Sequence, residues 1–318
     1  MRHLISTPVN SAPQGAVVEE LRAVDGVRLR AARWAPGGEP RGTVALFFGR
    51  GEFIEKHYET IGDLLRRNFV VAALDWRGQG GSERQLRNRM KAHVDDFSLY
   101  ERDFAAFVTD VLTPYCPRPW FGLGNSMGAA ILLMIAYAGR CPFERMALTS
   151  PMIGIAGVTD RRRVQLLIET LDAIGLGGAF APGGKARPSG LGPFENNVWT
   201  SNPVRYARWA SALRADASVG VGWPTVGWLL AAIRLTLQFE DFDYPRSIHT
   251  PILVFAAGKD RVAITSACER FAERLRAGRL IVVDGAEHDI LLERDLYRDQ
   301  FWAAFDAFIP GAEGGKTA

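Results

Sequence analysis

Ser126 is the side chain whose surroundings in this sequence most clearly indicate chemistry. It lies in the sequence GNSMG, after the apolar run Trp120–Leu123 and before a run of good helix formers. A G-x-S-x-G sequence between a strand and a helix is typical of a nucleophile elbow, a tight turn that exposes the serine hydroxyl at the carboxyl edge of a sheet. Gly124 and Gly128 would relieve crowding in that turn. A helix N-cap is an alternative role for Ser126, but it explains neither the two glycines nor the preceding strand.

The hydroxyl of Ser126 needs a base to act as a nucleophile at neutral pH. In folds built around such an elbow, the acid and then the histidine follow the serine along the chain. Of the five histidines, only His249 and His288 do so. His249 precedes the apolar run that starts at Pro251, which would place it at the opposite end of the sheet. Because His288 follows an apolar run, we predict that His288 is the base.

The acid should lie after the strand that precedes the one leading to His288. Asp260 comes just beyond the predicted strand Ile252–Ala257. Its carboxylate would accept the Nδ1 proton of His288, hold the useful tautomer and stabilise the imidazolium. Asp284 and Asp289 are nearer to His288 in sequence and are the alternatives. We prefer Asp260 because Asp284 would still be on its strand and Asp289 would point into the following helix.

Two backbone N–H groups are expected to form an oxyanion hole. The amide of Met127, at the start of the helix, would point toward the same space as the nucleophile. The second donor should come from the loop after the apolar run Thr43–Gly49, where the sequence reads GRGEF. Gly49 and Gly51 would let the backbone approach a developing oxyanion, which makes the amide of Arg50 the candidate donor. A tight turn into a helix would explain the same residues and is compatible with this role.

Strand-like and helix-like segments alternate along most of the chain. The runs Thr43–Gly49 and Phe69–Trp76 are continuously apolar, as expected for central strands covered on both faces. The segment Val27–Trp34 alternates with period two, which predicts an exposed antiparallel strand. The segment Asp95–Leu112 has the spacing of an amphipathic helix capped by its N-terminal aspartates. This alternation predicts an α/β fold with a mostly parallel sheet and helices on both faces.

The segment 152–248 interrupts the alternation. It contains a stretch rich in glycine and proline between two amphipathic patterns, Arg163–Ile174 and Val226–Leu237, and four of the eight tryptophans. We therefore predict a core formed by residues 15–151 and 249–310, with residues 152–248 inserted as a cap. Residues 1–14 are expected to be flexible, and residues 311–318 to form a disordered tail.

The composition restricts the classes of protein and partner. A net charge of +3 is mild and does not indicate nucleic-acid binding. The three cysteines form no disulfide framework, which suits a reducing compartment. We see no secretory signal and no apolar run long enough to span a membrane, so we expect a cytoplasmic protein whose membrane contact, through the cap, is peripheral. We expect no metal and no cofactor, and the sequence does not indicate an oligomeric state.

Several short sequences resemble the α/β-hydrolase superfamily. They are GRGEF, DWRGQGGS, GNSMGA, and the pair GKDRV and EHDILLE. Within the superfamily the chain resembles the lysophospholipase and monoacylglycerol lipase group, and its cap is most similar to bacterial lysophospholipases of the L2 kind. The resemblance implies an eight-stranded sheet, a triad of Ser126, Asp260 and His288, and a structural role for Asp75. Many members have histidine-glycine where this chain has Phe48, which leaves open how the oxyanion loop is braced.

The implied activity is ester hydrolysis through an acyl-enzyme. A long acyl chain needs an apolar cleft, which the two amphipathic cap helices could provide, although packing against the core would produce the same apolar stripes. The arginines at 161–163 and the basic stretch 83–93 could bind the phosphate of a lysophospholipid or could simply be solvated. We expect a lysophospholipase, mainly because of the resemblance.

Other functions would use the same residues. A monoacylglycerol lipase or a general carboxylesterase is one alternative. A peptidase acting on N-terminal prolines is another, and its cap would need acidic groups such as Glu195, Glu240 or Asp241. A serine at the elbow argues against epoxide and haloalkane hydrolysis, which use a carboxylate. A non-catalytic binding protein usually lacks a triad member, whereas none is missing here, and acyl transfer to an alcohol would require exclusion of water.

Overall fold

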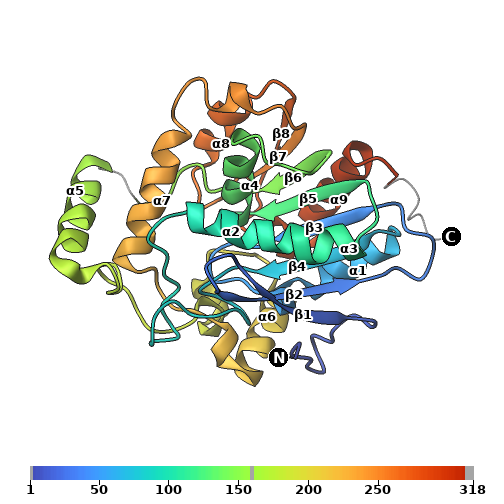
Figure 1. Cartoon of the computed structure of the whole chain (residues 1–318), viewed down its shortest axis with the longest axis horizontal. Helices are drawn as coiled ribbons and strands as arrows, with labels where there is room; N and C mark the ends of the chain where they lie inside the picture. Colours follow the sequence, from blue (N-terminus) through green and yellow to red (C-terminus); the bar gives the residue numbers. More distant parts are fainter. Residues whose placement is uncertain (1–2, 158–160, 312–318) are drawn as a thin grey trace.

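One eight-stranded, mostly parallel sheet forms the centre of the computed structural model, with helices on both faces (Figure 1). The structure describes residues 3–157 and 161–311. The strand order is β1-β2-β4-β3-β5-β6-β7-β8. The β1–β2 and β2–β4 pairs are antiparallel, and all the other pairs are parallel. The predicted fold class is therefore confirmed.

The strands follow the apolar runs of the sequence. The two that were expected to be covered on both faces, β3 and β4, are buried along their whole length, because they lie in the middle of the sheet with helices above and below. β5, which leads to the elbow, is buried in the same way. The strands are β1 (Val17–Arg22), β2 (Arg28–Trp34), β3 (Thr43–Phe47), β4 (Val70–Asp75), β5 (Trp120–Asn125), β6 (Arg145–Thr149), β7 (Ile252–Ala257) and β8 (Gly278–Val283).

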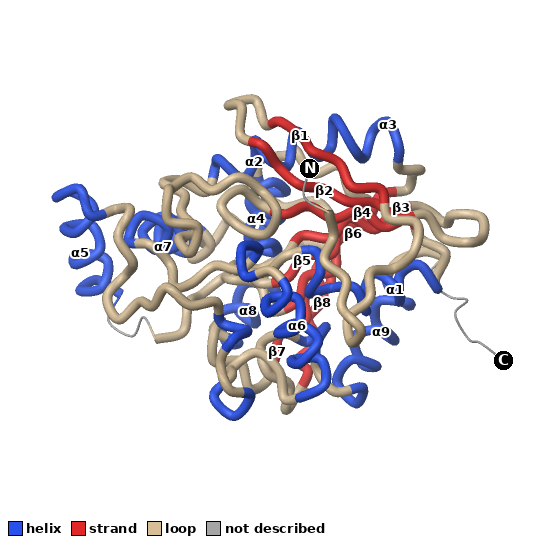
Figure 2. Tube along the Cα trace, turned by 90° about the horizontal axis from the view of Figure 1, so that it is seen from below, coloured by secondary structure: helices blue, strands red, loops and turns tan. Residues whose placement is uncertain are grey.

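The helices bury their apolar faces against the two sides of the sheet. One hydrophobic cluster joins α2, α4 and α8 to one face, and a second joins α1 and α9 to the other. Figure 2 shows the same layers after a rotation of 90°. The described helices are α1 (Tyr58–Arg66), α2 (Ser98–Phe107), α3 (Thr113–Tyr115), α4 (Met127–Tyr137), α5 (Arg161–Leu171), α6 (Pro203–Ala215), α7 (Val226–Gln238), α8 (Thr265–Ala272) and α9 (Asp295–Phe308).

The helix expected over residues 95–112 begins at Ser98. The carboxylate of Asp96 accepts the N–H of Ser98 at 2.7 Å, which satisfies one of the N–H groups that a helix start leaves free. After Phe107 the backbone continues as the π-helical turn Val108–Leu112. The predicted segment is therefore helical over most of its length, with a change of pitch.

The expectation of an exposed strand at residues 27–34 is wrong. β2 lies between β1 and β4 and is buried over most of its length. The arginine that appeared to mark its solvent face, Arg30, is 4% exposed and forms ion pairs with Asp75 and Glu55. A buried arginine with two carboxylate partners produces the same alternating sequence as an exposed one, so the period alone did not distinguish them.

The segment between β6 and β7 carries α5, α6 and α7. α5 packs against α7 and projects at one side of the molecule (Figure 1). α6, which the periodicity did not predict, has a recognisable start: the side chain of Asn202 accepts the N–H groups of Val204 and Arg205, and Pro203 occupies the first helical position.

Residues 3–14 lie against the core. The N–H of Ile5 donates to the carboxylate of Glu55 at 3.1 Å, and the amide of Asn10 donates to the carbonyl oxygen of Glu55 at 2.9 Å. The indole of Trp34 donates to the carbonyl oxygen of Pro13. These bonds connect to the core a segment that was predicted to be flexible from its composition. Residues 312–318, expected to be disordered, lie outside the described residues.

Candidate active site

The strand-to-helix turn at Ser126 has strained backbone geometry. Ser126 directly follows β5 and precedes α4, with φ 50° and ψ −114°. A serine with positive φ is uncommon and persists only where the surroundings impose it. A Cβ at position 128 would lie 2.3 Å from the carbonyl oxygen of Phe47, and one at position 124 would lie 2.9 Å from the Cα of Ala129. Both glycines of the turn are therefore required by close backbone approach, which an N-cap role would not explain.

His288 and Asp260 lie in direct contact. Nδ1 of His288 is 2.8 Å and 2.9 Å from the two carboxylate oxygens of Asp260. Asp260 is held in place by the N–H groups of Val262 and Ala263, which both donate to Oδ1 at 2.8 Å. The two alternative acids lie elsewhere: Asp284 is exposed, and Asp289 is bonded to Lys56.

The electrostatics of this pair favour a basic imidazole. Burial disfavours the imidazolium, but the negative charge and hydrogen bond of Asp260 outweigh it, so the pKa of His288 is raised above its usual value of 6.5. Burial likewise disfavours the carboxylate of Asp260, but His288 and the two backbone N–H groups outweigh it and lower its pKa. Asp260 is therefore ionised at neutral pH and can stabilise a proton taken up by His288.

Backbone bonds join the elbow to the segment that carries His288. The N–H of Ser126 donates to the carbonyl oxygen of Thr149, at the end of the neighbouring strand β6. The next residue, Ser150, donates its hydroxyl to the carbonyl oxygen of His288 at 2.6 Å. The elbow, the end of β6 and the histidine loop are thus consecutive parts of one edge of the sheet, where the carboxyl ends of the parallel strands meet.

The loop after β3 approaches the elbow closely. A Cβ at Gly49 would lie 3.1 Å from the Cβ of Ser126, so the glycine allows the backbone of Gly49 and Arg50 to come near Ser126. The side chain of Gln79 bridges this loop, because its amide donates to the carbonyl oxygen of Gly49 at 2.8 Å and its oxygen accepts the N–H of Gly51 at 3.1 Å. Met127 begins α4, where N–H groups have no partner within the helix. Amides of Arg50 and Met127 would suit an oxyanion.

The departure at Phe48 has a structural compensation. Its ring stacks on the imidazole of His57, with the ring centroids 4.4 Å apart and the planes at 9°. The carboxylate of Glu52, in turn, accepts the N–H of Gly49 at 2.6 Å and contacts Nε2 of His57 at 3.2 Å. The loop that carries the predicted oxyanion donor Arg50 is therefore held by an aromatic stack and a buried carboxylate.

Glu52 belongs to a buried charged cluster that the sequence reasoning missed. Lys56 forms ion pairs with Glu52 at 2.5 Å and with Asp289 at 2.6 Å. Asn125, next to the nucleophile, donates its amide to both carboxylates. Burial disfavours a charged lysine, but the two carboxylates outweigh it and raise the pKa of Lys56. The cluster links the oxyanion loop, the elbow and the residue after His288.

One signal for this cluster was present in the sequence. Charged residues at positions 52 and 56, four apart at the start of a helical pattern, are suited to pairing. Nothing local indicated that Asp289 would complete the cluster, because it lies 233 positions from Lys56. The cap also touches it: the ammonium group of Lys56 lies 4.3 Å from the ring centroid of Trp209, and the N–H of Asp289 donates to the carbonyl oxygen of Trp199.

Asp75 organises the turn after β4. Its carboxylate accepts the N–H of Ile54 at 3.0 Å and that of Gly81 at 2.7 Å, and it is paired with Arg30. A Cβ at Gly80 would lie 2.2 Å from Cγ of Asp75, so this turn needs glycine. These contacts agree with a structural role.

A cavity of about 520 Å³ lies between His288, the loop at Arg50 and the cap, and Ser126 is not among the residues that line it. His288 and the oxyanion loop line one part of it. The cap supplies most of the rest, including all four of its tryptophans. The large apolar side chains that line the cavity are Met152, Ile155, Val198, Trp199, Trp209, Val221, Trp223, Trp228, Leu229 and, outside the cap, Val262. A cavity of this kind suits an apolar ligand whose polar end reaches His288.

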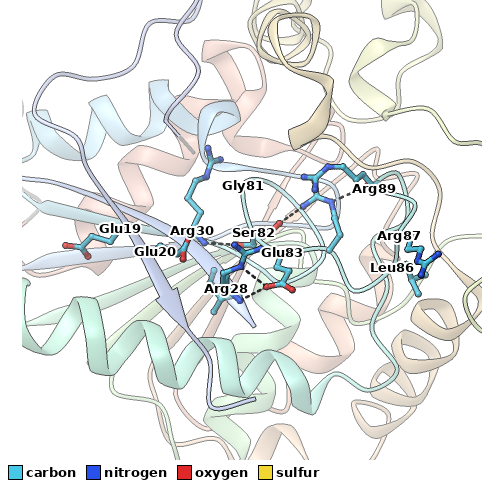
Figure 3. A pocket seen from close by; sticks show the side chains of 12 residues that line it. Glu19, Glu20, Arg28, Arg30, Gly81, Ser82, Glu83, Leu86, Arg87 and Arg89 are labelled. Carbon is cyan, nitrogen blue, oxygen red and sulfur yellow. Dashed lines mark hydrogen bonds and ion pairs between the residues drawn. The ribbon is translucent and has the colours of Figure 1, made fainter. Parts of the chain in front are cut away.

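A second cavity, of about 310 Å³, lies over the end of β2 and the segment after β4 (Figure 3). Its lining is strongly charged, and the dashed lines in Figure 3 mark the bond of Arg28 to Glu83 and that of Arg30 to Ser82. None of the predicted site residues lines it. In residues 3–157 and 161–311, no group of three or more metal-ligating side chains is arranged to hold a metal ion.

Within the described helices, none is long and apolar enough to cross a membrane.

The chain is similar to known proteins over most of its length. The profile of the family described as "Serine aminopeptidase, S33" matches residues 38–295. The chain is 32% identical over 291 residues to lysophospholipase L2 of Escherichia coli strain K12, and the match covers 88% of this chain and 83% of that protein. It is 26% identical over 280 residues to a monoglyceride lipase homolog of monkeypox virus, and this match covers 87% of this chain and 92% of the viral protein.

Two solved structures show the same fold at low sequence identity. A carboxyl esterase from Bacillus coagulans has a TM-score of 0.73 and 17% identity, and the match covers 94% of this chain and 99% of that one. A soluble variant of monoglyceride lipase from Saccharomyces cerevisiae has a TM-score of 0.71 and 19% identity, and the match covers 92% of this chain and 95% of that one. At these identities the structures support the fold alone.

Proposed function

Since the chain belongs to the serine aminopeptidase (S33) family of α/β-hydrolases, we propose that it is a lysophospholipase that cleaves the acyl ester of a lysophospholipid. The observation that carries this proposal is the cavity in which the imidazole of His288 meets an apolar, tryptophan-rich lining. Such a cavity can shelter an acyl chain from water while its ester lies beside the base. The similarity to lysophospholipase L2 over most of the chain supports the same substrate class.

In the proposed reaction, Ser126 attacks the ester carbonyl while His288 accepts its proton at Nε2. Asp260 keeps the proton of Nδ1 and stabilises the resulting imidazolium. The amides of Arg50 and Met127 donate to the oxyanion of the tetrahedral intermediate. His288 then gives its proton to the leaving glycerol oxygen, and water, activated by the same histidine, hydrolyses the acyl-enzyme.

The cavity favours an ester over a peptide with a free amino terminus. A free amine would need an acidic partner, yet Glu195, Glu240 and Asp241 are exposed and are absent from the described lining of the cavity. Glu52 does line it, but its carboxylate is already bonded to Lys56 and His57. We therefore favour ester hydrolysis over proline aminopeptidase activity.

The cap also offers a surface for a lipid interface. One side of α5 packs on α7 through Ile168, whereas Leu166 and Leu167 are 66% and 50% exposed. Ile174, in the following turn, is 66% exposed. Exposed leucine and isoleucine side chains on a projecting helix would enter the interfacial region of a bilayer, where lysophospholipids reside. We therefore include peripheral membrane contact through α5 in the proposal.

A fluorophosphonate probe and a substrate panel test the proposed function. The wild type should be labelled, and S126A should lose both labelling and hydrolysis. The panel contains lysophosphatidylcholine, lysophosphatidylethanolamine, a monoacylglycerol of the same acyl chain, p-nitrophenyl esters and a proline-terminated amide. Turnover of the lysophospholipids supports the proposal. Turnover of the monoacylglycerol alone would assign a monoacylglycerol lipase, and an unlabelled wild type would indicate a binding protein.

A further inference from the structure

The cavity that reaches His288 contains an arginine whose charge has no acidic partner among the residues that the structure describes. Three cations line this cavity: Arg50, Lys56 and Arg261. Lys56 is paired with Glu52 and Asp289, and Arg261 is paired with Glu287. Of the three, only Arg50 forms no ion pair with a carboxylate of the described chain. Two of the three charges are thus balanced within the protein, and one is not.

Arg50 is held in place by neutral groups. Its Nη2 donates to the carbonyl oxygen of Gly222 in the cap, and its guanidinium carbon lies 5.2 Å from the ring centroid of Trp228. Its Nε is buried and has no hydrogen-bond partner among the residues that the structure describes. Burial without a compensating carboxylate lowers the pKa of Arg50 to about 10, so the side chain is still charged at neutral pH.

Arg50 is partly buried, and a buried donor such as its Nε is costly unless an anion supplies the missing interaction. The guanidinium is fixed beforehand by Gly222 and Trp228, so an anion that binds it would order little else. Arginine is also the side chain best suited to a phosphate, because several N–H donors lie in one plane. The site therefore has the chemistry of a receptor for one phosphate group.

The position of Arg50 relates this phosphate to the scissile ester. Its backbone amide is the proposed oxyanion donor, so the ester carbonyl would lie at the main chain of Arg50. In a lysophospholipid the glycerol moiety separates the ester carbonyl from the phosphate by a few bonds, a span similar to that from the main chain of an arginine to its guanidinium. One residue could thus contact both polar groups of one substrate molecule.

We propose that the guanidinium of Arg50 binds the phosphodiester of the lysophospholipid and selects it over a neutral monoacylglycerol. This inference rests on the proposed function, because it assigns the group that recognises the headgroup phosphate. It differs from the sequence-based interpretation, in which the arginines at 161–163 and the stretch 83–93 could bind the phosphate or could simply be solvated.

The test compares two substrates of the same acyl chain in wild type, R50M and R50K. The ratio of kcat/KM for lysophosphatidylcholine to kcat/KM for the monoacylglycerol should fall by roughly 10- to 100-fold in R50M. R50K, which keeps the charge but not the planar donors, should recover part of the ratio. The ratio cancels any displacement of the backbone amide, which affects both esters. R261M is the matched control, since Arg261 lines the same cavity with its charge balanced, and it should change the ratio less than about threefold.

A second measurement separates this inference from the proposed function. An ether analogue of the lysophospholipid keeps the phosphate but cannot be cleaved, and it is assayed as an inhibitor of p-nitrophenyl ester hydrolysis beside the corresponding alkylglycerol and inorganic phosphate. The ether lipid should inhibit the wild type at least tenfold better than the alkylglycerol, and R50M should lose this difference. That result would support the inference even if the wild type failed to cleave lysophospholipids.

Three outcomes would overturn the inference. One is an unchanged substrate ratio in R50M with wild-type cleavage of lysophospholipids intact. The second is equal inhibition of the wild type by the ether lipid and the alkylglycerol. The third is inhibition by inorganic phosphate as strong as that by the ether lipid, which would show a site for the free anion and not for a lipid headgroup.

Discussion

Replacing Asp260 by asparagine provides a sharp test of the predicted triad. Oδ1 of Asp260 accepts two backbone N–H groups at 2.8 Å, from Val262 and Ala263. In D260N the side-chain oxygen must stay at that position, because an NH₂ group there would face two donors. The NH₂ group would then face Nδ1 of His288, at the place where the second carboxylate oxygen now lies at 2.8 Å.

This substitution should force the wrong tautomer on His288. An NH₂ donor at the Oδ2 position, 2.8 Å from Nδ1, opposes a proton there, and Oδ1, at 2.9 Å, already accepts two backbone N–H groups, so the ring proton should move to Nε2, which could no longer accept the proton of Ser126. We expect kcat to fall by about 10⁴-fold for both lysophospholipid and p-nitrophenyl ester substrates. The fold itself should change little, because asparagine has nearly the shape of aspartate.

The pH dependence gives a second readout of the same change. In the wild type, Asp260 raises the pKa of His288 above 6.5, and activity is lost as the pH falls through that raised value because the base becomes protonated. In D260N the carboxylate that raises the pKa is gone while the burial that lowers it remains. The midpoint of the acidic limb of kcat/KM should therefore move to a lower pH than in the wild type.

Asp284 supplies the matched control. It is exposed at the end of the neighbouring strand, so D284N should retain wild-type kcat and an unshifted acidic limb. The assay is a pH series of initial rates with one p-nitrophenyl ester for the three proteins. A D260N enzyme with more than a tenth of wild-type kcat, or with an unmoved acidic limb, would refute the assignment of Asp260 as the partner of His288.

Two further predictions concern the parts that support the site. E52Q removes a carboxylate that is 4% exposed and bonded to a buried lysine, so the free energy of unfolding in urea should fall by about 3 kcal/mol. The control E83Q, in an exposed ion pair, should lower it by less than about 1 kcal/mol. Equal effects of the two substitutions would show that the buried cluster is not stabilising. The double variant L166S/L167S should bind phosphatidylglycerol vesicles about tenfold more weakly in a flotation assay. Its control is V24S, at a residue 87% exposed and outside the cap, and an unchanged affinity of the cap variant would contradict the membrane proposal.

Much of the catalytic edge could be predicted because its signals are local. The elbow depends on two glycines within two residues of Ser126, and the close approaches at Gly124 and Gly128 explain why both are needed. His288 followed from elimination and from its position after a strand, and Asp260 from the same rule applied one strand earlier. The contact between them agrees with that reasoning, although their catalytic roles are still predictions.

The burial of charged residues could not be predicted in the same way. Arg30 lies in a strand that was predicted to be exposed and instead pairs with two carboxylates inside the fold. The sequence reasoning used only the backbone amide of Arg50 and gave its side chain no role. For Arg30 the periodicity gives the side of the strand on which the side chain lies, but not what covers that side, and Arg50 lies in a turn, where no periodicity applies.

The sequence by itself indicated the α/β fold and the tight turn at Ser126, because strand, turn and helix preferences depend on neighbouring residues, and it gave Ser126, Asp260 and His288 as the predicted nucleophile, acid and base. Only the tertiary structure decided which distant charges meet. Lys56 and Asp289 are 233 positions apart in the chain and 2.6 Å apart in space. The cap carbonyl and indole that hold Arg50 come from residues 222 and 228. The positions of these groups depend on how the whole chain packs around the sheet and excludes water, and no local sequence pattern predicts that packing.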